Sequence, residues 1–210
     1  MTDIAGQYFN IWTRDELDNI VSVMKDVPTL IINKNECKGI DENHIEYYWF
    51  MEVVYKRLQG LFGENIKPVF GMFLNETTPW RIHTDAYHCA KFPDREPALS
   101  ILMPYALDND INNLDKGYTL VFNERTQSNE ETSELPDMSS DPNSAVNIYQ
   151  EHLTHNSIDL VKKVTVKGIY PWVSGSVIYW DSLLLHDSNN FLRYGLHSKQ
   201  AIVVHTYKDK

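Results

Sequence analysis

The chain has 210 residues, with 19 basic and 29 acidic side chains and a formal net charge of −10. This length is enough for one domain with a full hydrophobic core, and 42% hydrophobic with 23% charged residues is ordinary for a soluble globular protein. The acidic balance argues against a broad phosphate-binding surface, because proteins bind nucleic acid through many Lys and Arg contacts. We therefore expect no nucleic-acid partner.

Neither a membrane span nor a secretory signal is expected. The apolar runs are far shorter than the ~18 residues that a spanning helix needs. The first residues, Met1 to Gln7, lack a basic start followed by an apolar block. Cys37 and Cys89 have no metal-type spacing, and two unpaired thiols suit a reducing compartment. We expect a cytoplasmic protein.

The N-terminal part predicts two helices separated by a strand. Thr13 and Glu16 have the spacing of a capping box, which predicts a helix over about 14–26. A strand is predicted over 29–33, and a second helix over about 41–61, ended by a glycine. The core face of the first helix is expected to comprise Leu17, Ile20, Val21 and Met24.

From residue 67 onward, short β-branched and aromatic runs alternate with turn residues, which is typical of an antiparallel sandwich or barrel. No repeat or linker divides the chain, so we expect a single domain over 1–210. Residues 1–66 would form its helical support and residues 67–210 its β-barrel core. The predicted strands cover 69–75, 98–105, 117–122, 159–166, 176–180 and 200–207.

An insert over about 124–157 interrupts the strand pattern. Its first part is acidic, contains Pro136 and Pro142, and has no useful periodicity. A solvated surface loop is the simplest interpretation, and a lid over a site is the alternative. A short helix is expected within 144–155.

The candidate metal ligands are His83, Asp85 and His186. His83 and Asp85 are two positions apart, so in an extended segment both side chains point the same way. His186 follows the β-branched and aromatic run 175–180. Two imidazoles and one carboxylate from separate segments form the facial triad that holds non-haem Fe(II) and leaves positions open. A His-x-Asp tripeptide alone is weak support, because chance produces it readily and a surface pair is its ordinary explanation.

Other residues near these ligands are weaker candidates. Asp181 and Asp187 flank His186 and are less favoured alternatives to Asp85 as the carboxylate ligand. For the aromatic candidates, packing in the barrel core or the pocket wall is the simpler role. The possible pocket residues are Trp80, His88, Trp180 and His205.

In order and spacing, these pieces resemble the Fe(II)/2-oxoglutarate-dependent dioxygenases, particularly the prolyl-hydroxylase-like branch. Trp80-x-x-His83-x-Asp85 is similar to that family's first two ligands, and Gly175-Ser-Val-Ile-Tyr-Trp-Asp-Ser…His186 to its third-ligand strand. The runs 99–102 and 116–122 look like the strands between them. The resemblance covers most of the chain. It implies a mainly β, double-stranded β-helix (jelly-roll or cupin-like) barrel with N-terminal helices packed on one face.

The resemblance also implies the chemistry. Fe(II) would be held by His83, Asp85 and His186, with 2-oxoglutarate and O2 as co-substrates. Succinate and CO2 would be released while a small-molecule or peptide substrate is hydroxylated. Related halogenases lack a carboxylate at the position of Asp85, so its presence favours hydroxylation.

One position departs from the family pattern. The family usually places a basic residue about ten positions after the third ligand, to pair with the far carboxylate of 2-oxoglutarate. Here Arg193 is seven residues and Lys199 thirteen residues after His186. Lys199 alternates with Ala201 and Val203 along the last predicted strand, so we favour Lys199 over Arg193 as this cofactor-binding residue, although Arg makes the better bidentate clamp.

Two functions of other classes remain open from the sequence. One is a cupin-like metal enzyme that does not use 2-oxoglutarate. The other is a non-catalytic β-barrel binding module in which the triad is accidental.

Overall fold

The computed structural model describes residues 4–32, 34–41, 43–44, 46–89, 94–108, 110 and 114–210, with only the backbone at His88 and Cys89. The predicted pocket role of His88 and the predicted free thiol of Cys89 therefore lie outside the described side chains.

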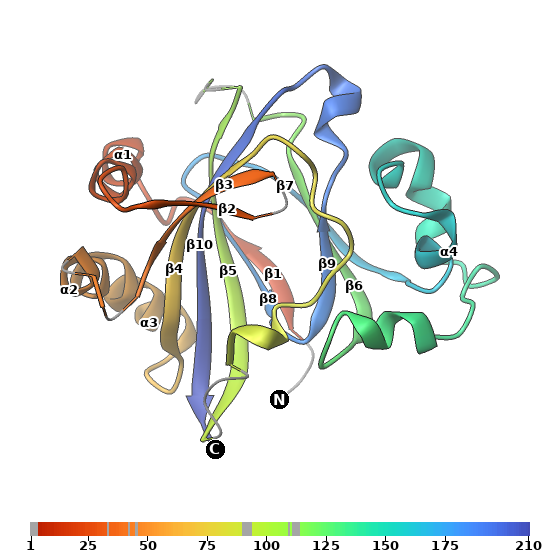
Figure 1. Ribbon diagram of the computed structural model, residues 1–210, viewed down its shortest axis with the longest axis horizontal. Coiled ribbons are helices and arrows are strands. Elements are labelled where there is room, and N and C mark those ends of the chain that lie inside the picture. The colour runs from red at the N-terminus through yellow and green to blue at the C-terminus, as the bar shows by residue number, and fades with distance from the viewer. Residues whose placement is uncertain are drawn as a thin grey trace.

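Two antiparallel sheets face each other (Figure 1), as the predicted double-stranded β-helix requires. The larger has the strand order β1-β8-β5-β10-β4-β3-β2, and the smaller has the order β7-β6-β9. The larger sheet is built from β1 (Ala5–Tyr8), β2 (Thr29–Ile32), β3 (Asn35–Ile40), β4 (Lys67–Glu76), β5 (Arg95–Leu107), β8 (Val177–Asp181) and β10 (Lys199–Asp209). The smaller sheet is built from β6 (Tyr118–Arg125), β7 (Val166–Pro171) and β9 (Leu184–Ser188).

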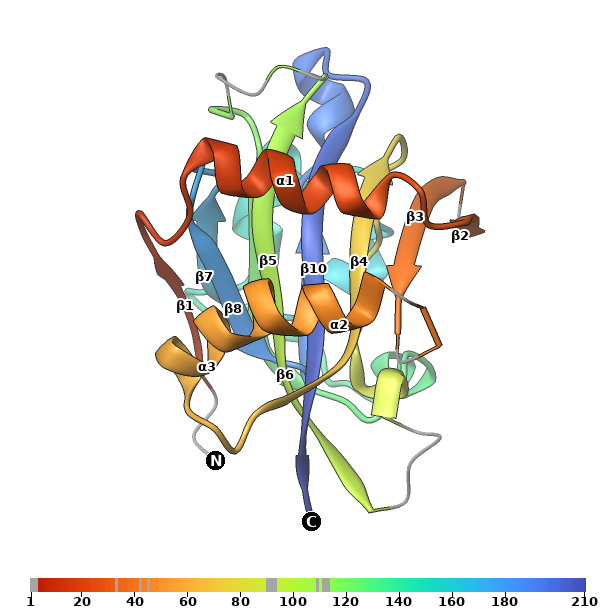
Figure 2. The same ribbon diagram turned by 90° about the vertical axis from the view of Figure 1, so that its left-hand side faces the viewer.

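The N-terminal helices cover the outer face of the larger sheet, crossing β5, β10 and β4 (Figure 2). They are α1 (Arg14–Met24), α2 (Glu46–Phe50), the π-helical turn η1 (Met51–Tyr55) and α3 (Lys56–Phe62). The predicted capping box is confirmed: Thr13 accepts from the Glu16 backbone N–H, and the Glu16 side chain accepts from the Thr13 N–H. The helix α2 packs so closely on β4 that a Cβ at Gly71 of β4 would collide with the ring of Phe50 in α2. No helix of the described residues is long and apolar enough to cross a bilayer.

Short helical segments occupy the connections. They are η2 (Ala86–Cys89), η3 (Glu130–Glu134), η4 (Ala145–Ile148), η5 (Tyr149–Leu153), α4 (Ile158–Val161) and η6 (Phe191–Tyr194). η4, η5 and α4 pack against the smaller sheet, on the side away from the larger one (Figure 1).

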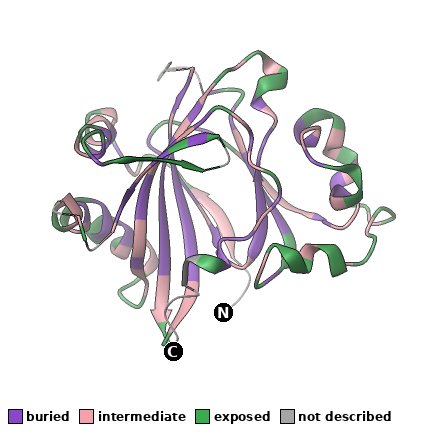
Figure 3. Cartoon of the chain, in the orientation of Figure 1, coloured by how far each residue is buried: buried purple, intermediate pink, exposed green. Residues whose placement is uncertain are grey.

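The buried residues form three layers: one under the helices, one between the two sheets, and one between the smaller sheet and the insert. The central strands are buried along most of their length (Figure 3). Residues 98–103 of β5 are all buried, because helices cover one face of that strand and the second sheet covers the other.

Some predicted elements differ from the structure. The predicted strand 159–166 is wrong: the helix α4 comes first, and β7 begins only at Val166. The Ser157 side chain caps α4 by accepting from the Leu160 N–H. This cap favours a helix start, despite the strand preference of the β-branched residues that follow. β1 and β3 were not predicted; they form because they pair with β8 and β4 at the flanks of the sheet.

The predicted third-ligand strand is in fact two strands. β8 belongs to the larger sheet, whereas β9, which carries His186, belongs to the smaller one. The chain therefore crosses between the sheets at residues 182–183, and this crossing brings the rings of Trp180 and His186 to a centroid distance of 4.6 Å.

Candidate metal centre

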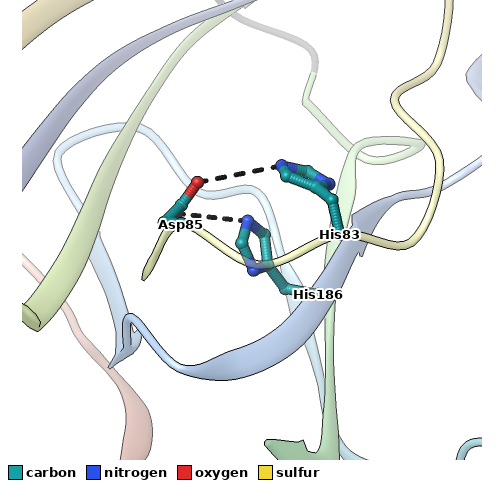
Figure 4. A group of neighbouring side chains, drawn as sticks. All are labelled: His83, Asp85 and His186. Carbon is teal, nitrogen blue, oxygen red and sulfur yellow. Dashed lines mark ion pairs between the residues drawn. The ribbon is translucent and has the colours of Figure 1, made fainter. Parts of the chain in front are cut away.

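A short backbone bridge joins the segment after β4 to β9. The His83 N–H donates to the His186 carbonyl at 3.1 Å, and the His186 N–H donates to the His83 carbonyl at 2.9 Å. Side chains of directly opposed residues lie close on one face, and here the two ring centroids are 4.2 Å apart. The Asp85 N–H donates to the Ser182 carbonyl at 3.1 Å, which places its carboxylate beside both rings (Figure 4).

The donor atoms of these residues converge. Nδ1 of His83 lies 2.6 Å from the Arg81 carbonyl, and Nδ1 of His186 lies 3.2 Å from the Leu184 carbonyl. Each ring therefore uses Nδ1–H for a backbone hydrogen bond and presents Nε2 to Asp85, at 3.9 Å for His83 and 3.3 Å for His186. One ligand atom from each of the three residues lies within 4.8 Å of the others. The structure thus brings together the three side chains that the sequence singled out.

The triad opens into a cavity of about 70 Å³ between the two sheets. Its walls are largely apolar, and the polar groups that line it besides the triad and His205 include Glu76, Thr119, Asp187, Ser188 and Lys199. The lining residues of the walls include Met72, Leu74, Leu102, Val203, Trp80 and Trp180.

Comparison with known proteins shows the fold but no relative in sequence. No family model matches the chain, and no curated protein matches it. Among solved structures, the α-ketoglutarate-dependent epimerase SnoN of nogalamycin biosynthesis superposes with a TM-score of 0.58 and 11% identity, covering 99% of this chain and 79% of that one. A 2OG-Fe(II) oxygenase-family protein of Burkholderia pseudomallei gives 0.54 and 11%, covering 97% and 85%. A Pseudomonas putida prolyl-4-hydroxylase gives 0.52 and 9%, covering 100% and 94%.

The chain has the fold of the 2-oxoglutarate/Fe(II) oxygenases. The predicted double-stranded β-helix with helices on one face is therefore confirmed, and the fold that the resemblance implied is the one observed.

The two tryptophans predicted to be pocket residues line the cavity beside the histidines of the triad. Trp80 lies beside His83, with ring centroids 5.5 Å apart, and Trp180 lies beside His186; both line the cavity. His205 reaches the triad from β10: its Nδ1 is 3.6 Å from the Asp85 carboxylate. Burial lowers the pKa of His205, opposed by Asp85, and the neighbouring imidazoles lower it further. His205 also lines the cavity, in the pocket position predicted for it.

The two alternative carboxylates are engaged elsewhere. Asp181 pairs with Arg125 at 2.8 Å and accepts from the Leu183 N–H. Asp187 lines the cavity, but it accepts hydrogen bonds from His155 at 3.1 Å and from Asn156 at 2.6 Å. Neither belongs to the three-residue cluster formed with His83 and His186.

Lys199 lines the cavity, whereas Arg193 is exposed in η6 and does not line it. The Lys199 ammonium is 1% exposed, lies 4.2 Å from the Trp172 ring, and donates to the Tyr118 carbonyl at 2.7 Å and to Ser188 Oγ at 2.9 Å. Burial lowers the pKa of Lys199 to about 8, although Glu76 and Asp187 oppose this.

Glu76 was missed by the sequence analysis. It is 4% exposed, lines the same cavity, and accepts from Ser188 Oγ at 2.8 Å. Burial raises the pKa of Glu76, and the charge of Lys199 opposes the rise. Its one local signal is alternation along β4, which puts it on the face of Met72 and Leu74.

The insert is more than a solvated loop, because it is hydrogen-bonded at several points to the segment that carries His83. Asn129 accepts from the Thr84 N–H at 2.9 Å, and Asn156 accepts from the Ile82 N–H at 3.0 Å. Nε2 of His155 lies 2.8 Å from the Trp80 carbonyl. Both ends of the insert thus hold the backbone around His83, and no pattern in the sequence predicts these contacts.

Replacing Asn156 with alanine is expected to loosen this segment. The change leaves the Ile82 N–H without its acceptor and Asp187 without one donor. We therefore expect the free energy of unfolding, measured in urea, to fall by about 2–3 kcal/mol. We also expect metal affinity to fall by about 10–100-fold. The matched control is Asn147→Ala, an exposed position of the same insert. Metal affinity equal in the two variants would contradict a positioning role for Asn156.

Proposed function

We propose that the protein is an Fe(II)- and 2-oxoglutarate-dependent oxygenase. One observation carries the proposal: two imidazole Nε2 atoms and a carboxylate converge at one end of a cavity in a double-stranded β-helix. This donor set is the one that holds non-haem Fe(II) with positions left open. Structures of the same fold include SnoN with Fe³⁺ and α-ketoglutarate, and HygX from Streptomyces hygroscopicus with nickel and 2-oxoglutarate.

The protein groups fit such an ion. Both histidines direct Nε2 into the site because backbone carbonyls occupy their Nδ1–H groups, and this arrangement strengthens an imidazole as a ligand. When bound, Fe(II) with 2-oxoglutarate and O2 supplies the oxidant for a substrate C–H bond, with release of succinate and CO2. The apolar wall keeps water away from the reacting centre.

We assign the part of the cavity that Lys199 lines to the distal carboxylate of 2-oxoglutarate. Lys199 supplies the charge there. Thr119 also lines the cavity, and its Oγ1 accepts from the Trp172 indole N–H at 3.0 Å, which leaves its own proton to donate. Arg193 takes no part in this assignment, because it lies outside the cavity.

The prime substrate has a separate place to bind. A cleft of about 810 Å³ adjoins the metal centre and shares Trp80, His83 and Tyr87 with the cavity. It lies between the β2–β3 turn, the segment before His83 and the start of η3. This volume is suitable for a small-molecule or a peptide substrate. Because the carboxylate of Asp85 would take the ligand position that a halide needs, we propose hydroxylation rather than halogenation.

Anaerobic titration separates this function from its alternatives. The purified protein is expected to bind one Fe(II), and added 2-oxoglutarate to give a weak visible charge-transfer band. Admitting O2 should then yield succinate. Iron uptake without the band or succinate would indicate a cupin-like enzyme that does not use 2-oxoglutarate. No metal uptake would indicate a binding module.

A further inference from the structure

More acidic than basic side chains line the cavity, which is unusual for a site that is to bind a carboxylate. Among the described residues that line the cavity, Lys199 is the only Lys or Arg, while Glu76, Asp85 and Asp187 are acidic. Asp85 faces the proposed metal ion, and Asp187 is hydrogen-bonded by His155 and Asn156. Glu76 is therefore the carboxylate left to balance Lys199.

Glu76 and Lys199 are joined in the fold. They lie directly opposite each other in the β4–β10 register, and both side chains are buried. Ser188 Oγ connects them: it accepts from Lys199 Nζ at 2.9 Å and donates to Glu76 Oε2 at 2.8 Å. The third contact of Nζ, with Asn189 Oδ1 at 3.4 Å, is long, so it is the one that an incoming carboxylate would most readily replace.

We propose that Glu76 takes up one proton when the distal carboxylate of the co-substrate enters beside Lys199. This inference rests on the proposed function and concerns one residue of the same site. With Glu76 ionised, one buried ammonium would face two carboxylates, and like charges in a buried site favour protonation of one of them. The proton comes from the solvent and binds a Glu76 carboxylate oxygen. Neutral Glu76 also gains an O–H donor, so it no longer repels the new carboxylate.

The surroundings of Glu76 support this assignment. The titratable groups close enough to act electrostatically on Glu76 include Lys199 on β10, Asp187 on β9, Cys37 on β3 and His83 in the loop after β4. Burial already raises the pKa of Glu76. Burial also raises the pKa of the Cys37 thiol, to about 11, so this thiol stays neutral and adds no charge near Glu76. A further anion pushes the Glu76 pKa in the same direction as burial does.

The consequence is a co-substrate affinity that falls as pH rises. Wherever free Glu76 is ionised and bound Glu76 is protonated, the affinity for 2-oxoglutarate drops about tenfold per pH unit. Glu76 therefore acts as a specificity-determining residue: a keto acid without a distal carboxylate does not require the proton.

The test uses Ni(II)-loaded protein and 2-oxoglutarate, with Ni(II) as an oxygen-stable substitute for iron. Calorimetry near pH 7 in two buffers of different ionisation enthalpy counts protons taken up, and infrared difference spectra detect a new protonated-carboxyl band. The variants are Glu76→Gln and, as a matched control, Glu36→Gln at an exposed position of β3. We expect about one proton and the new band in the wild type and in Glu36→Gln. In Glu76→Gln we expect no band, and affinity equal to or above wild type with a flatter pH dependence.

The outcomes are distinguishable. Binding by wild type without proton uptake or without the band overturns the inference and leaves the oxygenase proposal standing, as does a band that persists in Glu76→Gln. No 2-oxoglutarate binding by any metal-loaded form overturns both. The wild-type proton count does not depend on whether Glu76→Gln folds.

Discussion

Replacing His186 with alanine is expected to abolish stoichiometric Fe(II) binding. His186 supplies one of the three converging ligand atoms, and its backbone bridge with His83 shows that the two rings are placed as a pair. The loss of a ligand atom should cost more than the 10–100-fold that loss of a ligand's hydrogen-bond partner costs. We therefore expect metal affinity to fall by more than about 100-fold, with no visible band on addition of 2-oxoglutarate.

The control for this variant is His197→Ala, which removes an exposed imidazole outside the cavity. It should bind iron like the wild type, and circular dichroism should show both variants folded. A folded His186→Ala protein that keeps wild-type iron affinity would show that the ion binds elsewhere.

Replacing Lys199 with methionine is expected to affect both co-substrate binding and stability. Loss of a charge-assisted contact of about 2–3 kcal/mol corresponds to a loss of roughly 30–150-fold in 2-oxoglutarate affinity. The variant also leaves buried Glu76 without its cation, and breaking a buried pair costs about 3–5 kcal/mol in the free energy of unfolding. Binding is measured by calorimetry, and stability by urea unfolding.

The stability of the Lys199→Met variant is expected to decrease as the pH rises. The pKa of Glu76 is raised in the folded protein, and loss of Lys199 raises it further because the opposing charge is gone. The folded state then holds a proton that the unfolded chain releases above the ordinary glutamate pKa of 4.5. The stability of Lys199→Met should therefore be nearest to wild type below that value and decline as pH rises through the folded pKa. Adding Glu76→Gln should restore most of the loss, and equal stabilities for the single and double variants at neutral pH would contradict the pairing.

The features that the sequence could predict are those with local or short-range patterns. The capping box at Thr13 specifies the start of α1, because both of its hydrogen bonds lie within one turn. His83 and Asp85 were found because their spacing and a distant β-branched run ending at His186 form a recognisable set. Lys199 was favoured over Arg193 through alternation along one strand, and the structure places Lys199 alone of the two in the cavity wall.

The features that the sequence missed depend on how distant segments meet. Glu76 is opposite Lys199 only through the register of β4 with β10, a pairing of residues 123 positions apart that no local pattern encodes. Asn156 reaches Ile82 across 74 positions because the insert packs on the smaller sheet. Alternation along β4 shows which face Glu76 is on but not what it meets there, and Asn156 lies in irregular backbone, so the sequence predicted no role for either residue.

His83, Asp85 and His186 are expected to bind one iron ion together. Crystals grown without oxygen in the presence of Fe(II) and measured at the iron absorption edge would show whether they do. We expect one anomalous peak within bonding distance of Nε2 of both histidines and of a carboxylate oxygen of Asp85. An empty position there, or iron bound instead between His155 and Asp187, would contradict it.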